Sequence, residues 1–556
     1  MRNMRNRILT APMNDFQGGL NLNADPFQLG KNATADCLNV DFDPLGGFAQ
    51  RDAVVRINTT GLTSKPKSMW GYYTPDGSTR YAMVQQGNSV AYGTGGNFTQ
   101  AGTSAPFNVT TSGVMHAATF RNPQSLLSSV TAANVYIQRN AEQVPVRWDG
   151  STFTALTDPA AVPTSWSPTI GTQTYGRMPR AKFITAHRNY VFVASTSEDG
   201  KAHTSRIRWS HNGQPEDWRV QDYIDVEPAA GDAITGIASW NDRLLIFKNN
   251  AVFMLLGYDQ DTFEIVNLSR TIGSISQESI AICESGVFFF SWPEGVYFYD
   301  GSKLRDIFID LRPMIEDGTI DRTQRGLISC FWLKQRLYLN VPTDVTKTNN
   351  TEVYVFDPAL SGRGAWTRYQ FNGYGFVTGM EWTPPSYDSK WLAVWDYGGV
   401  SSNDWRVVEL HVNQADDQYV TDHVPITTRY QTPWMDLGNA ALVKSWRRPV
   451  LVLRGTADYD LSFTLYTNYD NTIPVKSFTA GTLGTTGTPL VWNVGQWDVN
   501  VWSADSGQAQ EVIKADRLGR AIAVSLLVTG PNTLATATRW GVNSITWKYI
   551  PKRIRS

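Results

Sequence analysis

The sequence predicts an all-β fold: a β-propeller of about seven four-stranded blades, followed by a C-terminal β-sandwich-like platform domain. The first observation is composition. Aromatic side chains make up 12% of the chain, with 20 Trp and 45 Gly but only 18% charged residues, which is typical of turn-rich β structure with buried aromatic surface. The second is that apolar runs are short and separated by turn residues. The third is that this pattern returns at a nearly constant interval.

The stretch 231–259 displays the repeating unit most clearly. Its apolar runs cover 234–238, 243–248 and 251–256, and a weaker alternating run follows at 263–268. Runs this short and this rich in Val, Ile and Phe are expected to be strands, because a helix of the same length would be marginal. Asn249 and Asn250, which tolerate positive φ, separate two of them. The unit is therefore predicted to be an antiparallel meander of four strands.

Copies of this unit follow one another along the middle of the chain. They open near residues 68, 115, 184, 234, 280, 327 and 376, and five of the six intervals are between 46 and 50 residues. The longer interval contains a Pro-rich insert at 158–180. Each copy is expected to close with an aromatic strand and a turn, such as WDGS at 148–151. One propeller blade uses this interval, whereas successive sandwich domains would need about 90 to 100 residues each. Seven blades are predicted, with six or eight as the alternatives.

The extent of the repeat divides the 556 residues into three parts, as expected for a chain too long for one core. Residues 61–412 are predicted to form the propeller, and 413–556, where strands lengthen and the repeat stops, the platform. Residues 1–60 are an N-terminal β arm, either separate or part of the platform. The platform contains a Gly/Thr-rich loop at 479–489 and a polar loop at 502–511. Its basic tail is expected to be a solvated end, with phosphate contact as the alternative; the tail contains Lys552, Arg553 and Arg555.

Charge and cysteine content exclude several classes of protein. Lys+Arg 49 and Asp+Glu 50 leave no basic excess for generic nucleic-acid binding. The three cysteines are far apart and lack CxxC spacing, which argues against a disulfide framework or a zinc site and favours a reducing cytoplasm; they are Cys37, Cys283 and Cys330. The first residues lack the apolar core of a secretory signal, and no run is long enough to span a bilayer. We expect a soluble product that leaves the cell by lysis or assembly.

The arm contains short alternating segments bracketed by double glycines at 18–19 and 46–47. Leu38, Val40 and Phe42 are predicted to share the buried face of a strand, which would leave Asp41 and Asp43 as solvated positions. A calcium site is the alternative for these two aspartates, but no third carboxylate or glycine completes a loop with metal-ligand spacing. No metal ion is predicted.

No catalytic constellation stands out, so we assign no catalytic, cofactor-binding or metal-binding residue. The motifs of serine hydrolases, zinc proteases, P-loops and dinucleotide-binding folds are absent. The histidines occur singly, as expected for surface or core residues rather than ligands; they are His116, His187, His203, His211, His411 and His423. A glycosidase would need paired carboxylates. Asp306 and Asp310 lie close to Asp300 and Glu294 in the sequence, but the last two belong to turns. PEDW at 215–218 is expected to be a turn with its Trp anchoring a blade.

The most specific feature of the chain is a motif within residues 16–51. It reads GGLN, then D-P, then N-V-D, then GG-F with a following Arg. Its residues are Gly18, Gly19, Leu20, Asn21, Asp25, Pro26, Asn32, Asn39, Val40, Asp41, Gly46, Gly47, Phe48 and Arg51. This motif resembles the opening of the bacteriophage tail nozzle proteins (tail tubular protein B) and of the packaged-DNA stabilisation proteins of short-tailed phages. The segment 234–255, RIRWS with PEDW, and GRAIAVSLLV at 519–528 are also similar to that group.

The resemblance implies a structural virion protein and not an enzyme. Proteins of this group combine a β-propeller with a platform-like β domain and form ring-shaped hexamers. By resemblance, this chain would form a homo-oligomeric ring, a hexamer, that binds a head–tail adaptor protein and tail fibres or spikes. Double-stranded DNA would pass through the lumen without sequence specificity, and the near-zero net charge suits such a bore because phosphate contacts would slow passage. The expected location is the virion tail, after assembly in the host cytoplasm, and no cofactor is implied.

Two other functions remain as alternatives. One is a propeller glycosidase or glycan-binding module that acts on host-surface polysaccharide. The other is an internal scaffold that is removed during assembly. Within the resemblance, the chain is shorter than the largest nozzle proteins, so both the nozzle position and the upstream stabilising position stay open.

Overall fold

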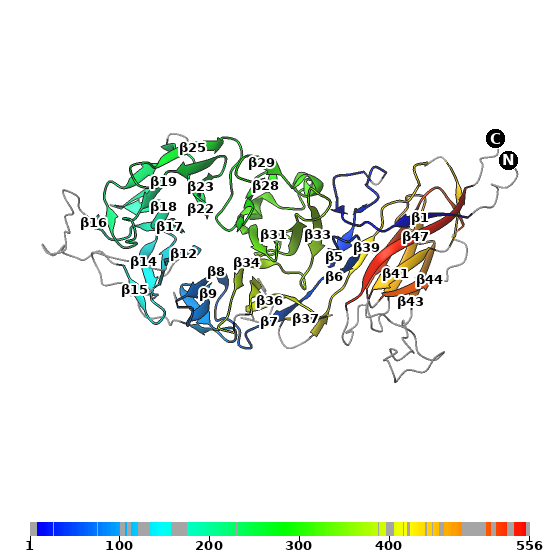
Figure 1. Cartoon of the computed structure of the whole chain (residues 1–556), viewed down its shortest axis with the longest axis horizontal. Coiled ribbons are helices and arrows are strands. Elements are labelled where there is room, and N and C mark those ends of the chain that lie inside the picture. The colour runs from blue at the N-terminus through cyan, green and yellow to red at the C-terminus, as the bar shows by residue number, and fades with distance from the viewer. Residues whose placement is uncertain are drawn as a thin grey trace.

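The structure, a computed structural model, describes most of the chain. The described residues are 8–551 except 26, 75, 101–105, 108–112, 121–132, 157–174, 199, 229–230, 387, 396–404, 415, 420–422, 440–441, 448, 455–460, 481–507, 513–518 and 531–538. Strands dominate them, and a propeller and a platform domain lie side by side along the long axis (Figure 1).

Six antiparallel sheets of four strands in chain order, together with a seventh of mixed origin, form the propeller. Blade 1 contains β8 (Pro66–Tyr73), β9 (Arg80–Gln86), β10 (Ser89–Gly93) and β11 (Thr99–Gln100). Blade 2 contains β12 (Met115–Phe120), β13 (Asn134–Arg139), β14 (Gln143–Trp148) and β15 (Phe153–Ala155). Blade 3 contains β17 (Arg180–His187), β18 (Tyr190–Glu198), β19 (Lys201–Trp209) and β21 (Tyr223–Asp225), beside the small pair β16 (Tyr175–Gly176) and β20 (Trp218–Arg219).

The next three blades repeat the arrangement. Blade 4 contains β22 (Ile234–Trp240), β23 (Arg243–Lys248), β24 (Val252–Leu256) and β25 (Glu264–Ser269). Blade 5 contains β26 (Ile280–Cys283), β27 (Gly286–Ser291), β28 (Gly295–Tyr299) and β29 (Leu304–Asp306). The short helices η2 (Ile309–Leu311), α1 (Pro313–Glu316) and η3 (Arg322–Leu327) follow it. Blade 6 contains β30 (Ser329–Leu333), β31 (Arg336–Val341), β32 (Glu352–Asp357) and β33 (Ala365–Tyr369).

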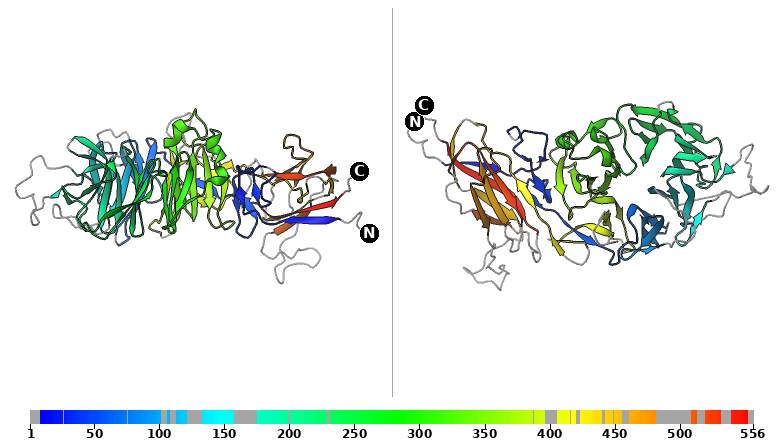
Figure 2. Two further views of the ribbon diagram at one scale, coloured as in Figure 1. Left: turned by 90° about the horizontal axis from the view of Figure 1, so that it is seen from above. Right: turned by 180° about the vertical axis from the view of Figure 1, so that it is seen from behind.

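The seventh blade closes the ring with a strand from the arm. Its sheet runs β34 (Phe376–Trp382), β35 (Lys390–Trp395), β36 (Arg406–Val412), β7 (Ala53–Arg56), β37 (Asp416–Gln418) and β38 (His423–Pro425). The arm strand β7 pairs antiparallel with β36, so the outer position is filled from before blade 1. The first strands of successive blades contact one another around the ring, and β34 contacts β8. Figure 2 displays the blades around their common axis.

Both ends of the chain build the platform. One sheet runs β44 (Gln508–Val512), β41 (Val450–Arg454), β47 (Gly541–Pro551), β40 (Lys444–Trp446) and β45 (Gly519–Ala521), with β1 (Leu9–Met13), β5 (Val40–Phe42) and β6 (Phe48–Gln50) attached. The other runs β4 (Cys37–Leu38), β39 (Arg429–Gln431), β46 (Val524–Thr529), β42 (Leu461–Thr467) and β43 (Lys476–Ala480). The parallel pair β2 (Gly19–Leu20) and β3 (Ala33–Thr34) lies beside β33 of blade 6.

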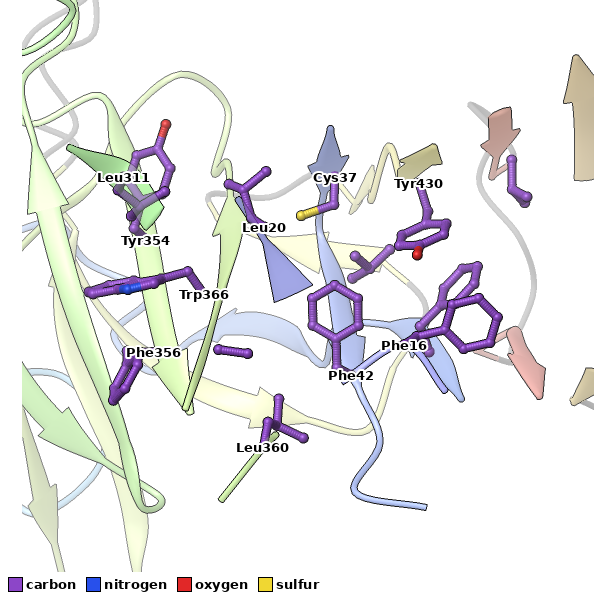
Figure 3. Packing of buried hydrophobic residues seen from close by; sticks show 14 of the residues in the cluster. Phe16, Leu20, Cys37, Phe42, Leu311, Tyr354, Phe356, Leu360, Trp366 and Tyr430 are labelled. Carbon is purple, nitrogen blue, oxygen red and sulfur yellow. The ribbon is translucent and has the colours of Figure 1, made fainter. Parts of the chain in front are cut away.

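One hydrophobic core runs from the platform into blades 5 and 6. Phe16 and Tyr430 belong to its platform side, and Phe356 and Trp366 to its blade 6 side. Leu20 of the arm lies between the two groups (Figure 3). Burial of this shared apolar surface holds the two domains together.

The predicted fold class is confirmed, and the blade count is seven. All seven predicted opening positions fall on or immediately before the first strand of a blade, from β8 to β34. One detail was wrong in most units: the aromatic strand expected to close the unit is the third strand, and an outer strand follows it, as the run at 263–268 had predicted for blade 4. Aromatic residues marked the third strand, whereas the outer strands of blades 1 and 2 are short and partly exposed and leave little periodic signal.

The structure divides the arm differently from the boundary at residue 60. Strands β1 to β6 belong with the platform or lie between the domains, while β7 belongs to blade 7. At the other boundary, β37 and β38 after residue 413 still extend the blade 7 sheet. The loop at 479–489, the polar loop at 502–511 and the basic tail fall largely or wholly outside the described residues, as does most of the insert at 158–180.

Candidate functional site

The N-terminal motif forms the joint between propeller and platform, and this joint is the candidate functional site. Two of its glycines permit close backbone approach. Gly19 has φ +64, and a Cβ there would lie 2.6 Å from the carbonyl oxygen of Trp366 on β33. Gly46 has φ +112, and a Cβ would lie 2.2 Å from the carbonyl oxygen of Asn14. Any other residue at these positions would push the arm off its neighbours.

The GGLN part of the motif and Asp25 shape the loop between β2 and β3. The side chain of Asn21 donates to Oδ1 of Asp310 at 2.7 Å and so ties the loop to the propeller. Asp25 Oδ1 accepts the N–H of Phe27 at 2.9 Å, a turn that an aspartate side chain stabilises. Pro26 lies outside the described residues.

Asn39 and Arg51 connect the arm to β37 of the blade 7 sheet and to the linker that follows β38. The guanidinium of Arg51 binds the carboxylate of Asp417 through two hydrogen bonds, of 2.8 and 2.5 Å, and both side chains are buried. Its Nε donates to Oδ1 of Asn39 at 2.9 Å. The Asn39 amide donates in turn to the carbonyl of Thr427 at 2.8 Å. Such paired hydrogen bonds fix the orientation of the groups as well as their distance.

Asp41 lies in an ion-pair cluster, so the expectation of a solvated position was wrong. Its carboxylate is 2.8 Å from Nη1 of Arg336 on β31, accepts a hydrogen bond from the hydroxyl of Tyr369 and lies 3.7 Å from Nη2 of Arg539. Burial alone would raise the pKa of Asp41, but Arg336, Tyr369 and Arg539 together lower it. Alternation placed Asp41 correctly opposite Val40, but the domain that covers that face comes from distant sequence.

Asp52 continues the cluster toward blade 7. Its carboxylate lies 2.6 Å from Nη1 of Arg539 and 3.3 Å from Nζ of Lys334. Nδ1 of His411 is 3.1 Å from Asp52 Oδ2, and Nε2 of His411 is 2.6 Å from the hydroxyl of Tyr338. Because an ionised carboxylate only accepts, Nδ1–H donates to Asp52 and Nε2 accepts from Tyr338.

The Asp52–His411–Tyr338 chain has the order of a catalytic relay but not its setting. Burial lowers the pKa of His411 and raises the pKa of Tyr338 far above its usual value, so burial favours the neutral form of both groups. The cavity beside these residues has a volume of about 10 Å³, close to the minimum for one water molecule and far below a substrate pocket. The arrangement therefore suits holding two domains in register.

The remaining described motif residues are also structural. Leu20 is in the shared core, and Gly47 approaches the backbone of β47 so closely that a Cβ would lie 2.9 Å from the carbonyl oxygen of Val542. The Gly18 N–H donates to the carbonyl of Asn32 at 3.0 Å. The structure thus brings Asn39, Asp41 and Arg51 into one junction, while the other motif residues shape the arm around it.

Sequence reasoning missed a second group of functional side chains, the buried amides at the seams between blades. In each case the amide oxygen accepts the N–H at the start of the next blade, which couples neighbouring sheets. The pairs are Gln85 with Met115 at 2.7 Å, Gln138 with Ala181 at 2.9 Å, and Asn340 with Phe376 at 3.0 Å. A polar residue near the end of the second strand of a unit was the available signal.

PEDW and one of the single histidines, both noted in the sequence, make polar contacts within the propeller. Trp218 of PEDW is buried and its indole N–H donates to the carbonyl of Pro215 at 2.8 Å, which confirms the anchored turn. Glu216 beside it binds Arg147 and Arg177, each at 2.9 Å, and links blade 2 to blade 3. His116 of β12 lies 3.5 Å from Glu278, which precedes β26. Because blades 2 and 5 are not neighbours, this contact spans the propeller axis.

The carboxylates considered for a glycosidase have structural partners. Asp300 caps its turn by accepting from the N–H of Ser302 at 2.9 Å, and Asp310 binds Asn21 of the arm. Asp306 accepts from the N–H of Phe308 and pairs with Arg312. Within the described part of the chain, no group of three His, Cys, Asp or Glu residues could hold a metal ion. The three cysteines are buried and free.

No described helix is long and apolar enough to cross a membrane.

No protein-family model and no curated protein matches the sequence. Among solved structures, the chain is similar to BBS1N in complex with ARL6DN (crystal soaked with mercury), with TM-score 0.37 and 9% identity over 67% of this chain and 97% of that chain. It is also similar to the Dos1 propeller, with TM-score 0.35 and 11% identity over 71% and 96% of the two chains. With TM-scores this low, these similarities carry no functional argument. The fold is assigned from the strand pairing in the described sheets.

Proposed function

We propose that this chain is a structural virion protein, a non-enzymatic subunit of the tail nozzle of a short-tailed phage. Six copies form a ring around the DNA channel, help retain the packaged genome, and bind a head–tail adaptor above and fibres or spikes at the side. The subunits assemble in the host cytoplasm and remain in the virion tail. The observation that carries the proposal is the role of Asn39, Asp41 and Arg51. These motif residues bear the resemblance to phage proteins and also join the propeller to the platform.

This role links the resembling motif to the arrangement of the two domains. A short leader outside the fold would place no constraint on the two domains, whereas these residues set how propeller and platform meet. A subunit with a fixed angle between two β domains can present the same two surfaces to its neighbours repeatedly, as a closed ring requires.

The DNA channel is proposed to lie between subunits and not along the propeller axis. The contact between His116 and Glu278 spans that axis. A duplex is also far wider than the space that seven four-stranded blades leave. The ring lumen is the remaining path, and a net charge of −1 keeps the chain from acting as a generic polycation toward phosphate.

Light scattering coupled to size-exclusion chromatography tests the ring. Purified protein should elute at about six times 62.0 kDa, and negative-stain images should have a central hole. Mass spectrometry of purified virions should detect the chain, which separates a nozzle subunit from a removed scaffold. A protein that stays monomeric at all concentrations, or is absent from virions, would overturn the proposal. Hydrolysis of host polysaccharide that is lost in Asp300→Asn or Asp310→Asn would favour the glycosidase instead.

A further inference from the structure

An exposed apolar surface begins on the loop of the N-terminal motif. The β2–β3 pair closes residues 21–32 into an Ω-loop, a compact class of loop that often carries function. Backbone N–H groups of Asn23 and Ala24 donate to Asn21 Oδ1 at 3.0 and 2.9 Å, which shapes the first turn. Beyond it, Phe27 leaves 66% of its surface exposed. A large aromatic side chain held outward by a well-bonded loop is costly unless something covers it.

Neighbouring side chains extend this surface over both domains. The Phe27 ring lies 4.3 Å from that of Tyr469, and the turn after Tyr469 carries Ile473 and Val475, which are 68% and 49% exposed. On the propeller side, the N–H of Leu22 donates to the carbonyl of Asp310, next to the exposed Ile309. We call this surface the apolar shelf; it comprises Leu22, Phe27, Ile309, Tyr469, Ile473 and Val475. It holds five of the twelve exposed large hydrophobic side chains in the described residues.

The charges around the shelf indicate what covers it. Asp25, Asp436 and Asp470 lie on or beside it and make no ion pair with a described residue; the nearby cations are Lys31 and Arg363, and Arg363 already pairs with Asp310. The other platform sheet carries a basic strip on or beside its adjacent strands β45, β40 and β47. The strip comprises Arg520, Arg447 and Lys548, none of which pairs with a described acidic residue. One chain therefore presents an acidic apolar surface and a separate basic surface.

We propose that the apolar shelf binds the basic strip of a second copy of this chain, and that this head-to-tail contact closes the ring. The inference rests on the proposed function, because a ring is what requires two different complementary surfaces on one subunit. Charge complementarity sets the orientation of the contact, and burial of Phe27 and Ile473 supplies its affinity. The Ω-loop is held by its own side chains, so little ordering is needed on assembly.

Exposed-residue variants test this contact, with wild-type protein measured alongside. Phe27→Ser and Ile473→Ser should raise the concentration for half-assembly at least about tenfold in sedimentation velocity, as expected for central interface residues. Tyr258→Ser and Val345→Ser are matched controls, since these side chains are 74% and 64% exposed on the propeller and should leave assembly unchanged. Near-UV circular dichroism and melting temperature of all four variants should match wild type when each is measured below the assembly concentration, because the substituted side chains are mostly solvent-exposed.

Charge reversal tests the second half of the proposal. Asp470→Lys and Arg520→Glu should each weaken assembly, whereas Arg270→Glu on the propeller should not. If wild type assembles and the shelf variants assemble equally well, the shelf is not the contact although the ring stands. If wild type never assembles, both this inference and the proposed function are overturned.

Discussion

The seams between blades and the junction between propeller and platform both hold neighbouring β-sheets in position, but they use different polar groups. At the seams, neutral amides such as Gln138 accept a backbone N–H of the next blade. At the junction, charges meet: the buried Arg51 with Asp417, and the partly buried Arg336 with Asp41. The seam partners Gln138 and Ala181 are 43 residues apart, whereas the junction partners Arg51 and Asp417 are 366 apart.

The two kinds of contact serve different purposes. Blades are consecutive in sequence and already stack through apolar faces, so an amide only has to align neighbouring strands. The platform is built from the two ends of the chain and could dock on the propeller at many angles. Buried ion pairs add little net stability after desolvation, but wrong arrangements leave a charge unpaired, so they favour one geometry. The junction therefore acts mainly through specificity, which we state as a hypothesis that the following variants test.

The largest effect is expected from Arg51→Met. It leaves the carboxylate of Asp417 buried without its cation, and removing one partner of a buried pair typically costs about 3–5 kcal/mol. Urea unfolding measures this loss. The double variant Arg51→Met/Asp417→Leu should be less destabilised than the sum of the two single variants, because no buried charge is then unpaired. Strictly additive losses would show that the pair is not coupled and would break the comparison.

Lowering the pH is expected to have the second largest effect, and it should destabilise the seams and the junction in different pH windows. His187 lies at the seam between blades 3 and 4, where its Nδ1 is 2.9 Å from the hydroxyl of Ser239. Burial lowers the pKa of His187 to about 4 and also lowers that of His411 at the junction. A histidine whose folded pKa is depressed stabilises the fold fully above its usual pKa near 6.5, and this contribution is lost as pH falls toward the folded value. His187 alone accounts for about 3 kcal/mol between pH 6.5 and about 4.

The carboxylates of the junction respond in a lower window. Burial opposes their ionisation, but the His411 hydrogen bond and Arg539 lower the pKa of Asp52, and Arg336 lowers that of Asp41. Their contribution is present above a pH of about 3.8 and is lost below it. Melting temperatures at pH 7.5, 5.5 and 4.5 should fall progressively, and His187→Gln should flatten the fall. Equal melting temperatures at pH 7.5 and 4.5 would contradict the assignment of neutral buried histidines.

Gln138→Leu should lower the free energy of unfolding by about 1–3 kcal/mol, which is less than the effect of Arg51→Met. It leaves one buried backbone N–H without an acceptor, but it leaves no charge unpaired. The N–H of Ala181 would lose its acceptor, and the carbonyl of Pro179 would lose the side-chain donor 3.0 Å away. Hydrogen exchange should accelerate at the start of β17 and leave the platform unchanged. The exposed Gln221→Leu is the matched control and should be nearly neutral. Faster exchange throughout the molecule would show that the seam acts globally.

The repeat made most of the propeller predictable from sequence. Short apolar runs at a constant interval located the first strand of every blade, because each strand must cover the same kind of neighbour. The strand β7 was not predictable in the same way, since it completes blade 7 from outside the repeat. Its pairing depends on where the chain returns in space, which a local pattern does not contain.

The junction was predictable only as a motif. Asn39, Asp41 and Arg51 were singled out by resemblance, yet their partners in the linker, blade 6 and the platform gave no local signal. Alternation placed Asp41 on the outer face of its strand, and only the packing of a second domain makes that face buried. Short-range rules could therefore give the strand but not the ion pair.

The smallest effect is expected where an ion pair has the junction's geometry but not its burial. Nη2 of Arg270 lies 2.8 Å from Oε1 of Glu227, nearly the distance between Arg51 and Asp417, yet these side chains are 71% and 40% exposed. Water screens such a pair, so Arg270→Ala should change the free energy of unfolding by no more than about 0.5 kcal/mol. High salt should remove even that difference while leaving the effect of Arg51→Met in place. The nitrogen–oxygen distance is nearly the same in the two ion pairs. A loss of unfolding free energy in Arg270→Ala comparable to that in Arg51→Met would therefore mean that burial does not distinguish the junction from the surface.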